Sequence, residues 1–224
     1  QPLVASLLAF SLVFLLKDID GGFKDFKWMN LPGLLLGLLC ITRPDSVIFV
    51  FSCAAAVFLI SKGKSPDKVL KLLFLPAFFI LAQMMFRIAY YGEWLPNTAY
   101  IKLSLSEAHL KAGWSYITSG TAVMAPLFVS VAVSLVFLYK NAETRSRSLL
   151  YAAIILPWMA YFFITGGDIF PGFRHFTPVI VVSAFAVFDA ASLYIKKNPK
   201  SSKYLFIAAV LAIAGVYGMI QPFS

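Results

Sequence analysis

The sequence predicts an all-α fold, a polytopic bundle of transmembrane helices. Three observations carry this prediction: the composition, the lengths of the apolar segments and the placement of the positive charges. Of the 224 residues, 60% are hydrophobic and only 13% are charged, and the mean hydropathy is +0.83. A soluble domain has about a quarter of its residues charged and could not bury so much apolar surface. Much of the chain is therefore expected to lie in a lipid bilayer.

Apolar segments recur along the whole chain and predict about eight membrane segments in a single transmembrane domain, residues 1–224. A full span needs about 20 apolar residues, and most of these segments come close to that length. Because the chain starts inside an apolar run and without Met, we expect it to be the C-terminal portion of a longer membrane protein. The segments are residues 2–16, 31–41, 46–60, 69–91, 121–139, 149–165, 178–195 and 204–220.

The second and third segments are too short to span alone, and they flank Thr42-Arg43-Pro44-Asp45. Proline breaks a helix and disfavours helical backbone in the residue before it. The pattern therefore predicts a helical hairpin with short arms and with Arg43 and Asp45 at its tip. Gly33 and Gly37 form a GxxxG motif, which lets a neighbouring helix approach closely.

The positive charges alternate between successive connections. Fourteen of the 19 Lys and Arg residues lie in or beside the connections 17–30, 61–68, 140–148 and 196–203. Such asymmetry indicates the cytoplasmic side, so the hairpin tip and the stretches 92–120 and 166–177 are expected outside. The basic balance is explained by the bilayer and requires no nucleic acid. The five remaining cations are Arg43, Arg87, Lys102, Lys111 and Arg174.

The outer stretch 92–120 is the longest connection. Within it, residues 104–119 place Leu105, Leu110, Trp114 and Ile117 near helical spacing, with charged residues between them. This pattern predicts an amphipathic helix on the outer membrane surface.

Three groups of residues at the outward ends of the segments combine cations, carboxylates and prolines. They are residues 42–45, Arg87 with residues 90–102, and residues 166–178. We expect them to form one polar pocket. Arginine and lysine suit a phosphate, a carboxylate suits proton abstraction, and aromatic rings suit a sugar face or the membrane interface. Two histidines and no CxxC, HExxH, P-loop or dinucleotide motif predict neither a metal nor a cofactor. The candidate binding residues are Arg43, Asp45, Arg87, Asn97, Lys102, Asp168, Arg174 and His175.

Simpler interpretations compete with each assignment. Arg43 and Asp45 can pair and cap two helices, and Arg87 can extend its charge out of a helix end to the interface. The loop with Asp168, Arg174 and His175 favours function, because three ionisable groups crowd one turn. Asp189 lies within an apolar segment near the cytoplasmic end, and we expect a nearby Lys to pair with it.

The same three groups resemble a known family. Tyr-Tyr-Gly-x-x-Leu-Pro-Asn-Thr-x-Tyr-x-Lys at 90–102 is similar to a stretch of bacterial GT-C glycosyltransferases, nearest to the terminal arabinofuranosyltransferases of mycobacterial cell-wall synthesis. Thr-Arg-Pro-Asp at 42–45, and Gly-Gly-Asp followed by Gly-x-Arg and Pro within 166–178, resemble two further motifs in the family's order. The chain departs from the family at Asp45, where Glu is common, and at His175, where Phe is common.

The resemblance implies an inverting glycosyltransferase of the bacterial inner membrane, with its active face outward, acting in cell-envelope glycan biosynthesis. Such enzymes move a sugar from a polyprenyl-phosphate donor to a glycan, lipid or protein acceptor. Their catalytic carboxylate usually lies in the first outward loop. No part of this chain corresponds to that loop, so we expect the base upstream and this piece inactive alone.

In that setting the cations would stabilise the departing phosphate, while Asn97 and Asp168 would orient sugar hydroxyls or loops. An alternative is a transporter or flippase of a lipid-linked or anionic solute, which would share intramembrane cations and broken helices. A third possibility is a non-catalytic membrane subunit.

Overall fold

The computed structural model describes residues 2–24, 26–93, 106–168 and 172–198, and within these residues every regular element is helical. This confirms the all-α prediction for the described part of the chain. The elements are α1 (Pro2–Asp20), α2 (Leu31–Thr42), the 3₁₀ turn η1 (Pro44–Ser46), α3 (Val47–Ile60), α4 (Pro66–Tyr91), α6 (Glu107–Val123), α7 (Ala125–Lys140), α8 (Arg145–Thr165), the 3₁₀ turn η2 (Arg174–Phe176) and α9 (Thr177–Lys197).

Four helical stretches are long and apolar enough to cross a membrane: α1, α4, α8, and η2 with α9. A fifth span results if α6 and α7 together count as one. Several candidate spans in one chain indicate a membrane protein. The predicted count of about eight is not confirmed, because α2 and α3 are shorter apolar helices and the segment 204–220 lies outside the described residues.

The region predicted as one span at 121–139, with a kink at Pro126, is divided between two helices. α6 continues to Val123, α7 begins at Ala125, and the two axes differ by 86°. Pro126 explains the break, because it stands in the first turn of α7 and has no N–H to continue the hydrogen bonds of α6. The helix predicted at 104–119 is present, beginning after Ser106, whose hydroxyl accepts from the His109 N–H at 3.2 Å.

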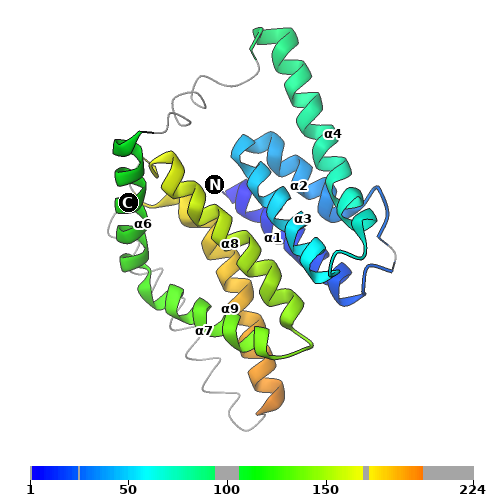
Figure 1. Ribbon diagram of the computed structural model, residues 1–224, viewed down its shortest axis with the longest axis vertical. Helices are drawn as coiled ribbons and strands as arrows, with labels where there is room; N and C mark the ends of the chain where they lie inside the picture. The colour runs from blue at the N-terminus through cyan, green and yellow to red at the C-terminus, as the bar shows by residue number, and fades with distance from the viewer. Residues whose placement is uncertain (1, 25, 94–105, 169–171, 199–224) are drawn as a thin grey trace.

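The predicted short-armed hairpin is present as α2, η1 and α3, but its arms pack mainly on other helices. α2 lies against α1 and α4, while α3 lies mainly against α8 (Figure 1). The GxxxG glycines allow the close approach of α4. A Cβ on Gly33 would stand 3.0 Å from the Leu72 carbonyl oxygen, and a Cβ on Gly37 would overlap the Phe79 ring.

The packed core gathers around α8, which contacts α3, α6, α7 and α9. Its Tyr151, Trp158 and Phe162 are among the largest fully buried side chains. α4, by contrast, buries only Leu72, Leu75 and Pro76, all in its first half, and its C-terminal end extends away from the other helices (Figure 1). Exposed apolar side chains on a long helix fit contact with lipid.

An ionic network joins α1, α8 and α9 at the opposite end of α8 from the Asp168 loop. Arg147 donates from Nη1 to Asp189 Oδ1 at 2.9 Å and from Nη2 to Asp20 Oδ2 at 2.5 Å. The Tyr151 hydroxyl donates to Asp189 Oδ2 at 2.6 Å. Asp189 is therefore paired, as expected for a carboxylate in an apolar segment, but its partner is Arg147 rather than the predicted Lys.

Candidate functional site

The break between α2 and α3 presents one ion pair of the site. Arg43 has extended backbone, φ −146° and ψ 114°, because a residue before proline is driven out of the helical region. Its Nε donates to Asp45 Oδ1 at 2.8 Å, and its Nη2 pairs with Asp45 Oδ2. Burial lowers the pKa of Arg43, but the hydrogen bonds and charge of Asp45 outweigh it, so that the net shift is upward. Arg43 therefore stays charged although its side chain is only 20% exposed.

Two aromatic residues of α8 support this pair, and the sequence interpretation did not single them out. The Trp158 ring centroid lies 5.9 Å from the Arg43 guanidinium carbon, a cation–π distance. The Tyr161 hydroxyl donates to Asp45 Oδ2 at 3.3 Å. Trp158 is fixed by stacking on Phe49 of α3, with centroids 4.4 Å apart. Trp158 and Tyr161 are three residues apart, so they lie on one face of a helix, and this spacing was the sequence signal that could have identified them as a pair.

The loop after α8 presents the second ion pair. Gly166 ends α8 with φ +76°, and Gly167 follows with φ +78°, both in the left-handed region that favours glycine. Asp168 accepts from Arg174 Nε at 2.5 Å and from Arg174 Nη2 at 3.2 Å. His175 Nε2 lies 3.2 Å from the same carboxylate. The Asp168 and His175 side chains are each 3% exposed, whereas that of Arg174 is 42% exposed.

Trp158 joins the two pairs into one cluster. Its ring lies under Arg43, and its Nε1 donates to the His175 carbonyl oxygen at 2.9 Å. The charge of Asp168 also adds to the upward shift in the pKa of Arg43. The predicted convergence of the hairpin tip with the Asp168 loop is thus supported by contacts. We call these residues the double-arginine cluster: Arg43, Asp45, Trp158, Tyr161, Asp168, Arg174 and His175.

Of the other predicted site residues, only Arg87 is among the described residues, and it does not join this cluster. Arg87 lies in the last turns of α4, the half of that helix that extends away from the bundle (Figure 1). The nearest link from that region is a bond of 3.5 Å from Gln83 Nε2 to the Ile41 carbonyl oxygen. Asn97 and Lys102 lie outside the described residues.

The cluster holds two guanidinium groups, two carboxylates and one imidazole, with aromatic faces beside them. This chemistry can hold a phosphate and a polar ring, because arginine binds phosphate oxygens in pairs. Among the described residues, no group of three or more His, Cys, Asp or Glu side chains could hold a metal ion. No family model, curated protein or solved structure matches the chain, so the functional argument rests on the site itself.

Proposed function

We propose that this chain forms part of an inverting membrane glycosyltransferase of the GT-C type. The sugar would come from a polyprenyl-phosphate donor and pass to a glycan, lipid or protein acceptor on the outer face of a bacterial inner membrane. The observation that supports this proposal is that Trp158 links two distant parts of the chain, because its ring lies under Arg43 and its Nε1 donates to the carbonyl oxygen of His175, the residue after Arg174.

The proposed role of the cluster is to hold the donor phosphate. As the sugar leaves the phosphate, negative charge grows on the phosphate oxygens, and preorganised cations lower the barrier. Arg174 is the accessible cation, with 42% of its side chain exposed, while Arg43 lies deeper at 20%. Asp45 and Asp168 orient the two guanidinium groups, so they act as positioning residues.

The aromatic side chains give the cluster a second feature of a sugar-phosphate site. Tyr161 is only partly buried and stacks on the buried Trp158 with centroids 5.0 Å apart, and an aromatic ring of this kind packs against the face of a sugar. We assign no catalytic base to this chain. The cluster's carboxylates are both engaged by arginine, which disfavours proton abstraction by either of them.

The test is binding of a polyprenyl phosphate to the chain in lipid nanodiscs, compared with the uncharged polyprenol. Arg174→Lys keeps the charge but loses the planar fork, and we expect it to weaken phosphate binding about tenfold, as for one charged hydrogen bond. Arg145→Lys is the matched control, because among the described residues this exposed arginine contacts Tyr139 alone: it donates to the Tyr139 carbonyl oxygen at 3.0 Å and lies 5.2 Å from the centroid of the Tyr139 ring.

A charge exchange separates phosphate binding from loop folding. Asp168→Arg combined with Arg174→Asp keeps one positive and one negative side chain in the loop, but it removes the phosphate-binding arginine from position 174. Because the Asp168 side chain is 3% exposed and lies 3.2 Å from His175 Nε2, the exchange will lower thermal stability, so binding is compared at a temperature at which the exchanged variant is folded. Under these conditions we expect it to lose its preference for the phosphate. Binding equal to that of the unmodified chain would show that Arg174 serves the loop alone and would end the proposal.

The alternative is a flippase for a lipid-linked solute, and one observation favours it. The 86° bend between α6 and α7, together with the short α2 and α3, is a pattern found in transporters with broken helices. Movement of an intact polyprenyl-phosphate sugar across proteoliposome bilayers, with no sugar released, would favour this alternative.

A further inference from the structure

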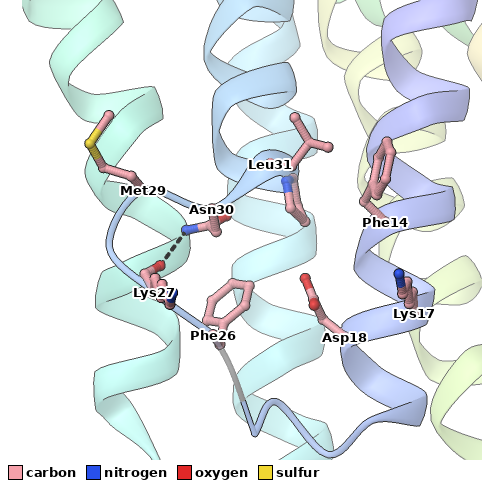
Figure 2. Close-up of a pocket in the computed structure, with 9 residues that line it drawn as sticks. Phe14, Lys17, Asp18, Phe26, Lys27, Met29, Asn30 and Leu31 are labelled. Carbon is pink, nitrogen blue, oxygen red and sulfur yellow. Dashed lines mark hydrogen bonds between the residues drawn. The ribbon is translucent and has the colours of Figure 1, made fainter.

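A pocket with charged and apolar lining lies away from the double-arginine cluster. A pocket of about 310 Å³ opens between the end of α1 and the segment that leads into α2 (Figure 2). Its volume is at the lower end of the range for small-molecule sites, about 300–1,000 Å³. It is lined by Phe14, Lys17, Asp18, Phe26, Lys27, Met29, Asn30, Leu31 and Pro32.

The pocket contains charges of both signs. Lys17 and Asp18 come from the last turns of α1, and Lys27 comes from the facing segment (Figure 2). The Asp18 carboxylate is half-buried and feels the positive charge of Lys17. Within the described part of the chain, it makes no hydrogen bond or ion pair. A partly desolvated carboxylate in this state favours a cationic ligand that can donate hydrogen bonds.

One wall of the pocket is preorganised by Asn30. Its Oδ1 accepts from the Gly33 N–H at 2.7 Å, and its Nδ2 donates to the carbonyl oxygens of Lys71 at 2.8 Å and Lys27 at 3.1 Å. These bonds tie the segment both to the start of α2 and to α4. The backbone of Lys27 is thereby held opposite α1 without support from a ligand, and a preformed wall reduces the entropy lost on binding.

The apolar lining continues along the helices in the direction of the membrane. Phe10 lies one helical turn before Phe14 on α1 and is 57% exposed, and Leu31 at the start of α2 is 42% exposed. α1 is itself a candidate span. A ligand in this pocket therefore meets charged groups at the helix end and exposed apolar side chains along the span.

We propose that this pocket binds a phospholipid whose headgroup carries a phosphate and a primary ammonium, as in phosphatidylethanolamine. The phosphate would lie between Lys17 and Lys27, and the ammonium would donate to Asp18. Phosphatidylglycerol offers no cation to Asp18. The trimethylammonium of phosphatidylcholine has a charge but no N–H to donate. This site is independent of the proposed function, since it shares no residue with the double-arginine cluster.

The test reconstitutes the chain in nanodiscs that contain equal parts of the three phospholipids. Native mass spectrometry then measures which lipids remain bound as the complex is stripped. We expect the ethanolamine lipid to be retained about tenfold over either competitor, the ratio given by one charged hydrogen bond. Equal retention of the three lipids, or a preference for either competitor, would refute the proposal, and this result needs no variant of the chain.

Substitutions locate the selectivity. Asp18→Asn should abolish the preference for the ethanolamine headgroup over phosphatidylglycerol, whereas Lys27→Gln should weaken retention of all three lipids. Asp67→Asn is the matched control, because Asp67 is 58% exposed and, within the described residues, pairs only with Lys71, at 3.4 Å on the same helix. Selectivity that survives Asp18→Asn in a chain with unchanged melting temperature would contradict the assigned role of Asp18.

Discussion

Replacing Arg147 with glutamine should destabilise the helix bundle, because this side chain ties three helices together. Its two ion-pair partners differ in environment: the Asp189 side chain is 13% exposed and that of Asp20 is 44% exposed. A hydrogen bond to a charged, poorly solvated group contributes about 1.5–3 kcal/mol, whereas an exposed ion pair contributes about 0–1 kcal/mol. We therefore expect Arg147→Gln to lower the free energy of unfolding by about 2–3 kcal/mol.

The assay is equilibrium unfolding in mixed micelles with a denaturing detergent, followed by the fluorescence of the tryptophans, which include the buried Trp158. Asp189→Asn should cost more than Asp20→Asn, and the latter should stay below about 1 kcal/mol. Arg145→Gln, two positions away on the exposed side, is the control and should change little. The reasoning fails if Asp20→Asn costs as much as Asp189→Asn, or if Arg147→Gln leaves stability within about 0.5 kcal/mol of the unmodified chain.

Three further predictions concern packing, capping and topology. A Cβ on Gly113 would stand 2.6 Å from the Phe162 carbonyl oxygen of α8, so Gly113→Ala should push α6 away and lower stability by about 1–3 kcal/mol in the same unfolding assay. Asn30→Ala removes the N-cap of α2 and should cost at least about 1 kcal/mol; no loss of melting temperature would contradict this. For topology, a cysteine at the exposed Lys64 should resist an impermeant thiol reagent added outside, and one at Glu107 should react; the reverse pattern would invert the assigned orientation.

The helices were largely predictable from the sequence, because their signals are local. Apolar runs of sufficient length located α1, α4, α8 and α9, and Pro44 placed the break after α2. Left-handed glycines end α4 at Gly92 and α8 at Gly166, as their freedom at positive φ allows. The orientation in the membrane stays a prediction, since it depends on charge placement relative to a bilayer.

The candidate site was predictable only in part. Arg43 with Asp45, and Arg174 with Asp168, are close in sequence, so both pairings could be anticipated as alternatives to phosphate binding. The link between them could not, because it passes through Trp158 of a third segment. Arg87 was expected beside the two ion pairs. α4 packs against the other helices over only part of its length, and no sequence feature near Arg87 indicates where that packing stops.

The sequence by itself determined the all-α class, the apolar segments and the residue types available for a polar site, since these depend on composition and on neighbours within a few positions. Tertiary structure alone decided that Asp189 meets Arg147 rather than a lysine. Pro126 indicated a break in the sequence, but the angle of 86° between α6 and α7 was given only by the structure. Tertiary structure also decided that α4 is the helix that approaches Gly33 and Gly37. These outcomes depend on which helix faces meet, and that choice is made by side-chain volumes and partners distant in sequence.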